Sequence, residues 1–225
     1  MLALLTGLLA GIIHVWSGPD HLSALAPLSV RIKKKAWIAG ARWGVGHSAG
    51  VAIIGLLALW LRESLPVERL SGWGERLVGV MLIGIGIWGL LKTFRRHLHT
   101  HSHIHDGEEH VHAHFHAHPH EEKKKTAHIH MHAALGIGIL HGLAGSSHFL
   151  GILPALAFPT MIQSVVYIAS FAAGTILSMA IFTMIVGYLG TRASANSNRI
   201  YQWMMLTVSF AAIFVGCYWL LASGF

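Results

Sequence analysis

Long apolar runs with almost no charged residues are the feature that most restricts how this chain can fold. The chain has 225 residues, of which 54% are hydrophobic and only 11% are charged, and its mean hydropathy is +0.58. Soluble domains carry about 25% charged residues. The charges here lie in a few short stretches, and about 20 apolar residues are enough to cross the hydrocarbon core of a bilayer. The runs between these stretches therefore predict membrane-spanning helices.

Six hydrophobic segments stand out, and we expect an all-α membrane protein with six transmembrane helices. Their approximate bounds are 2–30, 36–61, 74–91, 132–158, 161–190 and 200–222. The first and fourth are interrupted by glycine and polar residues, which predicts broken helices. The chain then divides into a first group of three helices (1–92), a His-rich loop (93–131) and a second group of three helices (132–225).

The two interrupted segments are similar in sequence. Residues 11–21 (GIIHVWSGPDH) align with residues 138–148 (GILHGLAGSSH) at a constant offset of 127 residues. The matched pairs are Gly11 with Gly138, His14 with His141, Gly18 with Gly145, His21 with His148, and Pro27 with Pro154. With three spans in each copy, the second copy would be inverted relative to the first. Inverted repeats with paired broken helices are typical of secondary transporters, whose site lies near the midplane.

Six ionisable side chains fall within the predicted spans: His14, Asp20, His21, His47, His141 and His148. A charged group at the centre of a bilayer costs roughly 3 kcal/mol on insertion scales, so it needs a partner or a function. Imidazole nitrogens with an occasional carboxylate suit Ni²⁺, Co²⁺, Zn²⁺ and Cu²⁺. We therefore expect these six side chains to bind a divalent transition-metal ion, which is cargo and not a cofactor.

The spacing of His14 and His21 needs a broken helix if both are to reach one ion. Seven residues of continuous α-helix separate two side chains by about 10 Å along the axis. Gly18 and Pro19 stand between them, and Gly145 takes the place of Gly18 in the second repeat. A break at these positions would bring the two imidazoles closer together. Three further glycine pairs, Gly7 with Gly11, Gly46 with Gly50 and Gly138 with Gly142, predict close helix packing.

The loop between the third and fourth segments contains fourteen of the 19 histidines, largely at alternate positions. They are His97, His99, His101, His103, His105, His110, His112, His114, His116, His118, His120, His128, His130 and His132. This loop has little apolar content with which to fold, so we expect disorder without metal. Its many His-x-His pairs predict metal capture at modest affinity.

The basic residues indicate how the chain is oriented. Thirteen of the 16 lysines and arginines fall on the side of the His-rich loop when six spans are counted, and three fall on the other. The positive-inside rule then places this loop in the cytoplasm and both termini outside, in a multi-pass protein of the cell (inner) membrane. The N-terminal MLALLTGLLAG lacks a basic n-region, so we interpret it as a retained first helix.

Several other classes of protein are disfavoured. The net charge of +7 comes from residues at the ends of apolar runs, so no nucleic-acid partner is expected. A lone cysteine, Cys217, cannot form a disulfide within the chain, which argues against a membrane thiol–disulfide carrier. No glycine-rich P-loop with its lysine is present, so ATP hydrolysis by this chain is not expected. We expect neither an enzyme nor a resident cofactor.

At these residues the chain resembles the nickel/cobalt transporter family, in particular its short urease-accessory-like and nickel–cobalt efflux branch. The segment from His14 to His21 (HVWSGPDH) is similar to the family's histidine and Asp-His signature, and Gly46-His47-Ser48 is similar to its Gly-His-Ser motif. A His-rich loop in the middle of the chain is the third shared feature. The longer permeases have four residues between the histidine and Asp-His, not five, and Asp-Thr where this chain has Gly174-Thr175.

The resemblance implies a transporter of Ni²⁺ or Co²⁺, with Zn²⁺ as a further ion to test and proton exchange as a route of coupling. Import and export both remain open. The expected surroundings are metal ions and the lipid bilayer, and a cytoplasmic nickel chaperone or a second copy of the chain are open as partners. Two other functions also remain: a membrane metal-binding accessory factor for the maturation of nickel enzymes, and an exporter of a small anion such as sulfite.

Overall fold

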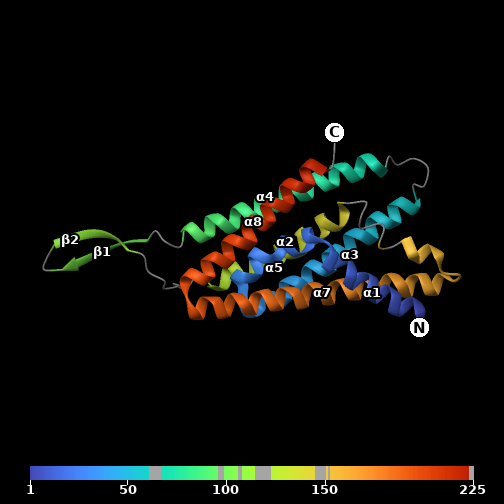
Figure 1. The fold of residues 1–225 in the computed structure, drawn as a ribbon, viewed down its shortest axis with the longest axis horizontal. Helices are drawn as coiled ribbons and strands as arrows, with labels where there is room; N and C mark the ends of the chain where they lie inside the picture. The colour runs from blue at the N-terminus through green and yellow to red at the C-terminus, as the bar shows by residue number, and fades with distance from the viewer. Residues whose placement is uncertain are drawn as a thin grey trace.

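Long helices run side by side along one axis of the molecule (Figure 1). The computed structural model describes the backbone of residues 1–60, 67–95, 99–105, 108–114, 123–144, 151 and 153–222, and side chains within 1–53, 72–94, 132–144, 151, 153–155 and 157–222. The elements are α1 (Leu2–Ser17), α2 (Pro19–Ile32), η1 (Lys33–Lys35), α3 (Ala36–Trp60), α4 (Val67–Arg95), β1 (His99–His105), β2 (Glu108–His114), α5 (Lys123–Leu143), η2 (Leu153–Ala157), α7 (Met161–Asn196) and α8 (Asn198–Ala222).

Three helices in the described residues are long and apolar enough to cross a membrane, namely Gly72–Phe94, Met161–Asn196 and Asn198–Ala222. A fourth span results if Leu2–Ser17 and Pro19–Ile53, which meet at a 70° bend, count as one broken span. His132–Leu143 is a shorter apolar helix. The chain is thus a helical membrane protein, as predicted, with three or four candidate spans among its described residues. The count of six spans stays a prediction.

The expected break in the first segment lies at Gly18. Helix α1 ends at Ser17, Gly18 has an extended backbone (φ −95°, ψ 98°), and α2 begins at Pro19. Proline suits the first position of a helix because the amide hydrogen it lacks would have no partner there. Helix α5 ends at Leu143. Gly145 and His148, at the corresponding break of the second repeat, lie outside the described residues.

Glycines allow the helices to approach one another closely, as the glycine pairs predicted. A Cβ atom on Gly7 or Gly11 of α1 would collide with backbone carbonyls of α7. The same is true of Gly46 on α3 against α5, and of Gly138 on α5 against α3. Helices α4 and α8 meet in the same way at Gly79 and Gly216. Small residues at such crossings are how helices pack in lipid, where both surfaces are equally apolar.

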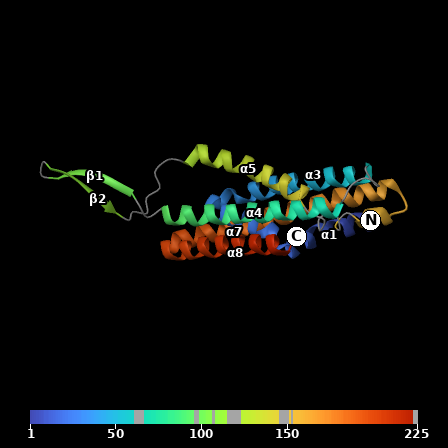
Figure 2. The same cartoon turned by 90° about the horizontal axis from the view of Figure 1, so that it is seen from above.

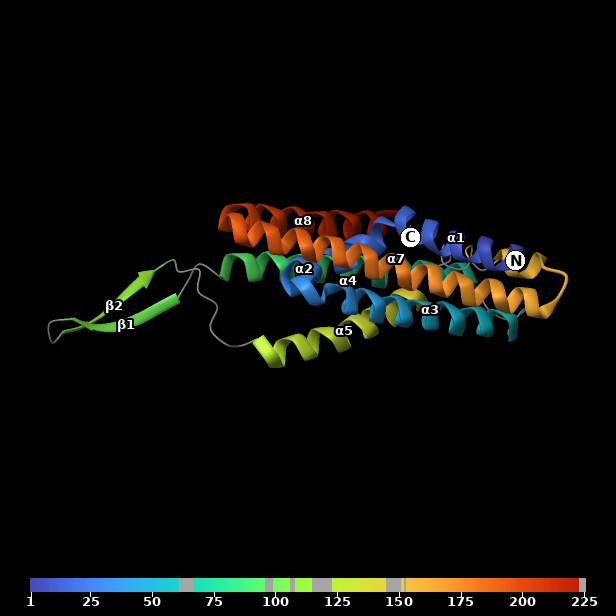
Figure 3. The same ribbon diagram turned by 90° about the horizontal axis from the view of Figure 1, so that it is seen from below.

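Helices α5 and α8 lie on opposite sides of the bundle (Figures 2 and 3). Helices α3 and α7 run between them in opposite directions, and the N-terminus lies at the end away from the strands (Figure 1). The turns from α2 to α3 and from α7 to α8 lie at the strand end, which we call the hairpin end. This arrangement encloses α2 and the helix break among α3, α5, α7 and α8.

The His-rich loop contains an antiparallel hairpin at its start, which its composition did not predict. Strands β1 and β2 pair with His99 opposite His114, His101 opposite His112, and His103 opposite His110. Alternation at every second position is also the side-chain period of a strand, so this pattern is compatible with pairing. His97, His116, His118 and His120 lie outside the described residues, as do the loop's other histidine side chains except the exposed His132. The division of the chain into three parts stays a prediction.

Candidate metal centre

The break at Gly18 brings together two histidines that a continuous helix would keep apart. His14 lies in the last turn of α1, and His21 lies in the first turn of α2. Their Nε2 atoms are 3.0 Å apart, whereas the same spacing on an unbroken helix would place the residues about 10 Å apart along the axis. A Cβ atom on Gly18 would collide with the His21 ring, so the break needs glycine here. The broken helix therefore builds the first part of the site.

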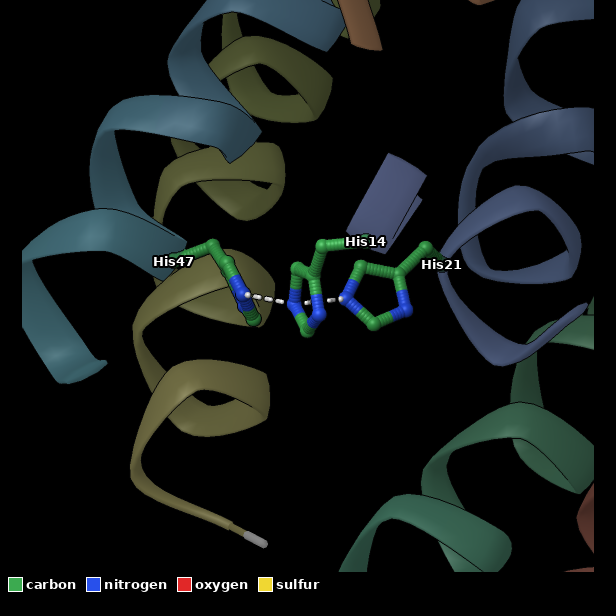
Figure 4. Close-up of side chains that lie close together, drawn as sticks. All are labelled: His14, His21 and His47. Atoms are coloured by element: carbon green, nitrogen blue, oxygen red, sulfur yellow. Dashed lines mark hydrogen bonds between the residues drawn. The ribbon is translucent and has the colours of Figure 1, made fainter. Parts of the chain in front are cut away.

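A third imidazole comes from α3. The Nε2 atom of His47 lies 3.3 Å from Nε2 of His14, so three Nε2 atoms converge (Figure 4). All three lie within 4.8 Å of one another. Two nitrogens bound to one ion at about 2.1 Å are about 3.0 Å apart at a right angle and about 3.4 Å apart at a tetrahedral angle. The two distances are those of hydrogen bonds between imidazoles in this structure, and they also fit imidazoles that share one transition-metal ion.

Asp20 joins this trio to the second half of the chain. Its Oδ1 accepts a hydrogen bond from His21 Nδ1 at 2.9 Å, and its Oδ2 accepts one from His141 Nε2 on α5 at 3.0 Å. A His21 ring that donates from Nδ1 presents a lone pair at Nε2, toward the trio. A carboxylate behind a metal-binding imidazole fixes its tautomer and orientation and increases its basicity. Asp20, His21 and His141 also form a second compact group of possible ligands.

The cluster lies in the interior of the protein. His47 and His141 have no exposed surface, Asp20 and His21 are only 3% and 2% exposed, and His14 is partly buried. His47 is the twelfth residue of the 25-residue helix α3, close to its midpoint. The cluster thus lies about halfway along this helix, far from both of its ends. Polar groups at such depth are costly unless they pair with one another, as these do.

Five of the six residues that the sequence pointed to are thus neighbours: His14, Asp20, His21, His47 and His141. They come from four helices, α1, α2, α3 and α5. The sixth, His148, lies outside the described residues, as does Gly145. His132, expected with the loop histidines, is exposed but lies within helix α5.

Two aromatic side chains border the cluster and were not predicted from the sequence. The Trp43 indole stacks on the His47 ring at an interplanar angle of 4° and a centroid distance of 4.8 Å, and it also contacts the His21 and His141 rings. Phe171 on α7 lies 5.3 Å from the His14 ring. The signal for Trp43 was its position four residues before His47, on the same helical face. No comparable signal links Phe171 to a histidine in sequence.

Three known proteins are similar to this chain in sequence over almost its whole length. The urease accessory protein UreH of Bacillus sp. (strain TB-90) is 30% identical over 230 residues, covering 100% of this chain and 93% of that protein. The chloroplast protein FOR GROWTH AND FERTILITY 1 of Arabidopsis thaliana is 36% identical over 212 residues, covering 94% of this chain and 56% of that protein. Its counterpart, FOR GROWTH AND FERTILITY 2, is 34% identical over 212 residues, covering 94% and 54%. The chain thus spans little more than half the length of the two plant proteins.

No solved structure matches the chain. Residues 2–213 match the family described as the cytochrome C biogenesis protein transmembrane region. The family is named for a transmembrane region and one relative is named an accessory protein; none of the matched names describes a catalyst, which agrees with the expectation that the chain is not an enzyme. The expected kinship with nickel/cobalt transporters is supported only at the level of a broader membrane family, through the urease accessory relative. From its length of match and its helical bundle, the chain belongs to the cytochrome c biogenesis transmembrane-region family of membrane proteins.

Proposed function

We propose that the chain is a secondary transporter that carries Ni²⁺ or Co²⁺ across a membrane through the histidine cluster. The observation that carries this proposal is the convergence of the Nε2 atoms of His14, His21 and His47 inside the protein. Imidazole nitrogens with one carboxylate suit these ions. Mg²⁺ and Ca²⁺ require a shell dominated by oxygen ligands, which this group does not offer. The name of the urease accessory relative points toward the same metal chemistry.

The proposed architecture is six spans in two inverted repeats. Its support comes from helix contacts that occur twice, with α5 in place of α1 and α7 in place of α3. The first pair of contacts is made by glycines of α1 and α5: a Cβ on Gly11 would meet the backbone of Phe171 and Thr175, and a Cβ on Gly138 would meet that of Trp43 and His47. The second pair is made by glycines of α7 and α3: a Cβ on Gly174 would meet the backbone of Leu8 and Ile12, and a Cβ on Gly46 would meet that of Leu135 and Ile139. The α1 and α5 positions differ by 127 residues and the α3 and α7 positions by 128. Such matching contacts are expected of two halves with one ancestral packing, and they relate Thr175 to His47.

The proposed transport cycle opens the cluster alternately to the two sides of the membrane. Metal binding needs neutral imidazoles and so displaces protons, which makes exchange with protons the natural coupling. The excess of basic residues on the loop side places the His-rich loop in the cytoplasm and both termini outside. We propose the cell (inner) membrane as the location. The plant relatives, named as chloroplast proteins, make a chloroplast membrane the second location to examine.

Metal flux into proteoliposomes tests the proposal. Proteoliposomes that contain the purified chain should accumulate radiolabelled Ni²⁺, and added Co²⁺ and Zn²⁺ should compete for this uptake if they share the site. His14→Ala, His21→Ala and His47→Ala should each lower the flux by about tenfold to 100-fold or more, because each removes one of three convergent nitrogens. His132→Ala is the matched control, since it removes one exposed imidazole on α5 outside the cluster, and its flux at saturating Ni²⁺ should be unchanged. Equal flux in the wild type and all three cluster variants would refute the site.

A second candidate function is a membrane-bound metal-binding accessory factor, which the name of the urease accessory relative favours. Such a factor would bind Ni²⁺ in detergent yet show no flux after reconstitution. Sulfite added as a competitor in the same assay tests whether the chain exports a small anion instead. An anion site needs fixed cationic or amide groups, whereas this site contains Asp20. Thiol–disulfide exchange within the chain needs two cysteines, and Cys217 is the single one.

A further inference from the structure

Trp43 and Phe171 lie against different members of the histidine cluster. Trp43 has no exposed surface, and its indole contacts the rings of His47, His21 and His141 at centroid distances of 4.8, 5.4 and 5.3 Å. Phe171 is 3% exposed and contacts the His14 ring at 5.3 Å. Two large aromatic rings are thus packed directly on the imidazoles of the cluster.

The two aromatic rings come from opposite directions. Helices α3 and α7 run antiparallel (Figure 1), so earlier residues of α3 lie nearer the hairpin end and earlier residues of α7 lie nearer the other end. Trp43 precedes His47 by four residues, and Phe171 precedes Thr175 by four residues. Side chains on a helix also lean toward its N-terminus. Trp43 therefore borders the cluster on the hairpin side, and Phe171 borders it on the opposite side.

The contacts of the two aromatics correspond to each other. Trp43 contacts His141 at 5.3 Å, and Phe171 contacts His14 at the same centroid distance. In sequence, His14 and His141 are the matched pair of the repeat. The backbone carbonyl of Trp43 packs against Gly138, and that of Phe171 packs against Gly11. Gly11 and Gly138 are also a matched pair of the repeat. The two rings thus occupy equivalent places on the two faces of the site.

We propose that Trp43 and Phe171 are the two gates of the ion path, one on each side of the histidine cluster. This inference rests on the proposed transport function. Withdrawal of the Trp43 indole opens the cluster to the hairpin side while Phe171 keeps the other side closed, and withdrawal of Phe171 does the reverse. With both rings in place, the structure corresponds to the occluded state. Apolar constrictions of this kind block ions because they exclude the water that hydrates them.

Thr175 offers a position from which each gate can be tested separately. It is fully buried one turn from Phe171 toward the hairpin end, and among the described residues its hydroxyl has no hydrogen-bond partner. A cysteine here would lie between the two gates. Cys217, the single native cysteine, is exposed on α8 and can be replaced by serine to give a silent background.

The parent for the experiment is the full-length chain with Thr175→Cys and Cys217→Ser, reconstituted in vesicles in which its orientation is known. A membrane-impermeant thiol reagent is added to one side at a time, and the rate at which the cysteine at position 175 is labelled is measured. Trp43→Ala should raise the labelling rate at least about tenfold from the hairpin side alone, and Phe171→Ala should do so from the other side alone. Trp43→Phe, which keeps a ring, and Phe210→Ala, which removes an exposed ring on α8, should leave both rates near the parent's.

Labelling that rises equally from both sides, or that stays at the parent's rate in both alanine variants, overturns the gates. If an alanine variant does not fold, as judged by its elution in detergent, Trp43→Leu and Phe171→Leu carry the same test with a smaller loss of volume. Failure of the proposed function gives a different result. If labelling is side-specific but the parent shows no Ni²⁺ flux, the gates exist and serve another cargo. Flux of Ni²⁺ without side-specific labelling rejects the gates alone.

Discussion

At the scale of single residues, Asp20 connects the two halves of the site. It accepts hydrogen bonds from His21, in the first half of the chain, and from His141, in the second. Only 3% of it is exposed, so both carboxylate oxygens depend on protein donors and not on water. An isolated carboxylate at this depth would be costly, and the two imidazoles offset that cost. The same contacts orient His21 so that its Nε2 faces His14.

Asp20→Asn tests this orienting role with little change of shape. The amide can accept at one atom only, and its NH₂ group opposes an N–H donor, so one of the two imidazoles loses its acceptor. We expect Ni²⁺ affinity to fall about tenfold to 100-fold by titration calorimetry in detergent. Ser29→Ala is the control, because Ser29 is a buried residue on the same helix whose hydroxyl donates a hydrogen bond to the Leu25 carbonyl, away from the cluster. An Asn variant that binds like the wild type would show that Asp20 does not organise the site.

At the scale of elements, two features decide where the histidines lie: the break between α1 and α2, and the glycine crossings between neighbouring helices. The break places His14 and His21 within hydrogen-bond distance. The crossing of α3 with α5 sets the distance between His47 and His141. The centroids of these two rings are 5.6 Å apart. Because backbone touches backbone at Gly46 and Gly138, a single added methyl group would push these helices apart.

Gly138→Ala and Gly136→Ala make a matched pair on α5. A Cβ at position 138 would collide with the Trp43 carbonyl, whereas a Cβ at position 136 has nothing within 4 Å. We expect Gly138→Ala to destabilise the protein by about 1–3 kcal/mol through overpacking, seen as a lower thermal midpoint in detergent. Gly136→Ala should be neutral or stabilising, because alanine is the better helix former by about 1 kcal/mol. Equal midpoints for the two variants would contradict the close crossing.

At the scale of the whole molecule, the site and the His-rich loop are separate structures. The cluster lies among α1, α2, α3 and α5, and the hairpin projects beyond the end of the bundle (Figures 1 and 2). The hairpin, placed in this way, can raise the local concentration of metal at one mouth of the path, but it does not reach the site in the interior. Its contribution should therefore depend on the metal concentration.

Deletion of residues 99–120 separates capture from transport. In proteoliposomes, flux at saturating Ni²⁺ should stay within about twofold of the wild type, while flux at low Ni²⁺ should fall several-fold as capture is lost. A full-length loop with its histidines changed to asparagine controls for loop length. In cells, a rise of accumulated nickel after the deletion indicates export and a fall indicates import. Loss of flux at every concentration would mean that the loop belongs to the path itself.

Much of the site could be read from the sequence because its signals are local. Apolar runs predict spans, Gly18 followed by Pro19 predicts a break, and ionisable residues inside a span are too costly to be incidental. These local signals are enough to single out His14, Asp20, His21, His47 and His141. The internal repeat supplied His141, which has no family motif of its own. The pairing of β1 with β2 was not foreseen, since a composition with few apolar residues predicts no fold.

Only the tertiary structure decided how these residues divide their roles. It showed three Nε2 atoms converging, Asp20 bridging between His21 and His141, and the Trp43 and Phe171 rings packed against the cluster. The physical reason is that a membrane helix is apolar on every side, so its sequence carries no hydrophobic stripe that tells which face meets which neighbour. That choice depends on backbone contacts at glycines and on buried polar pairs, and both form only when the helices pack.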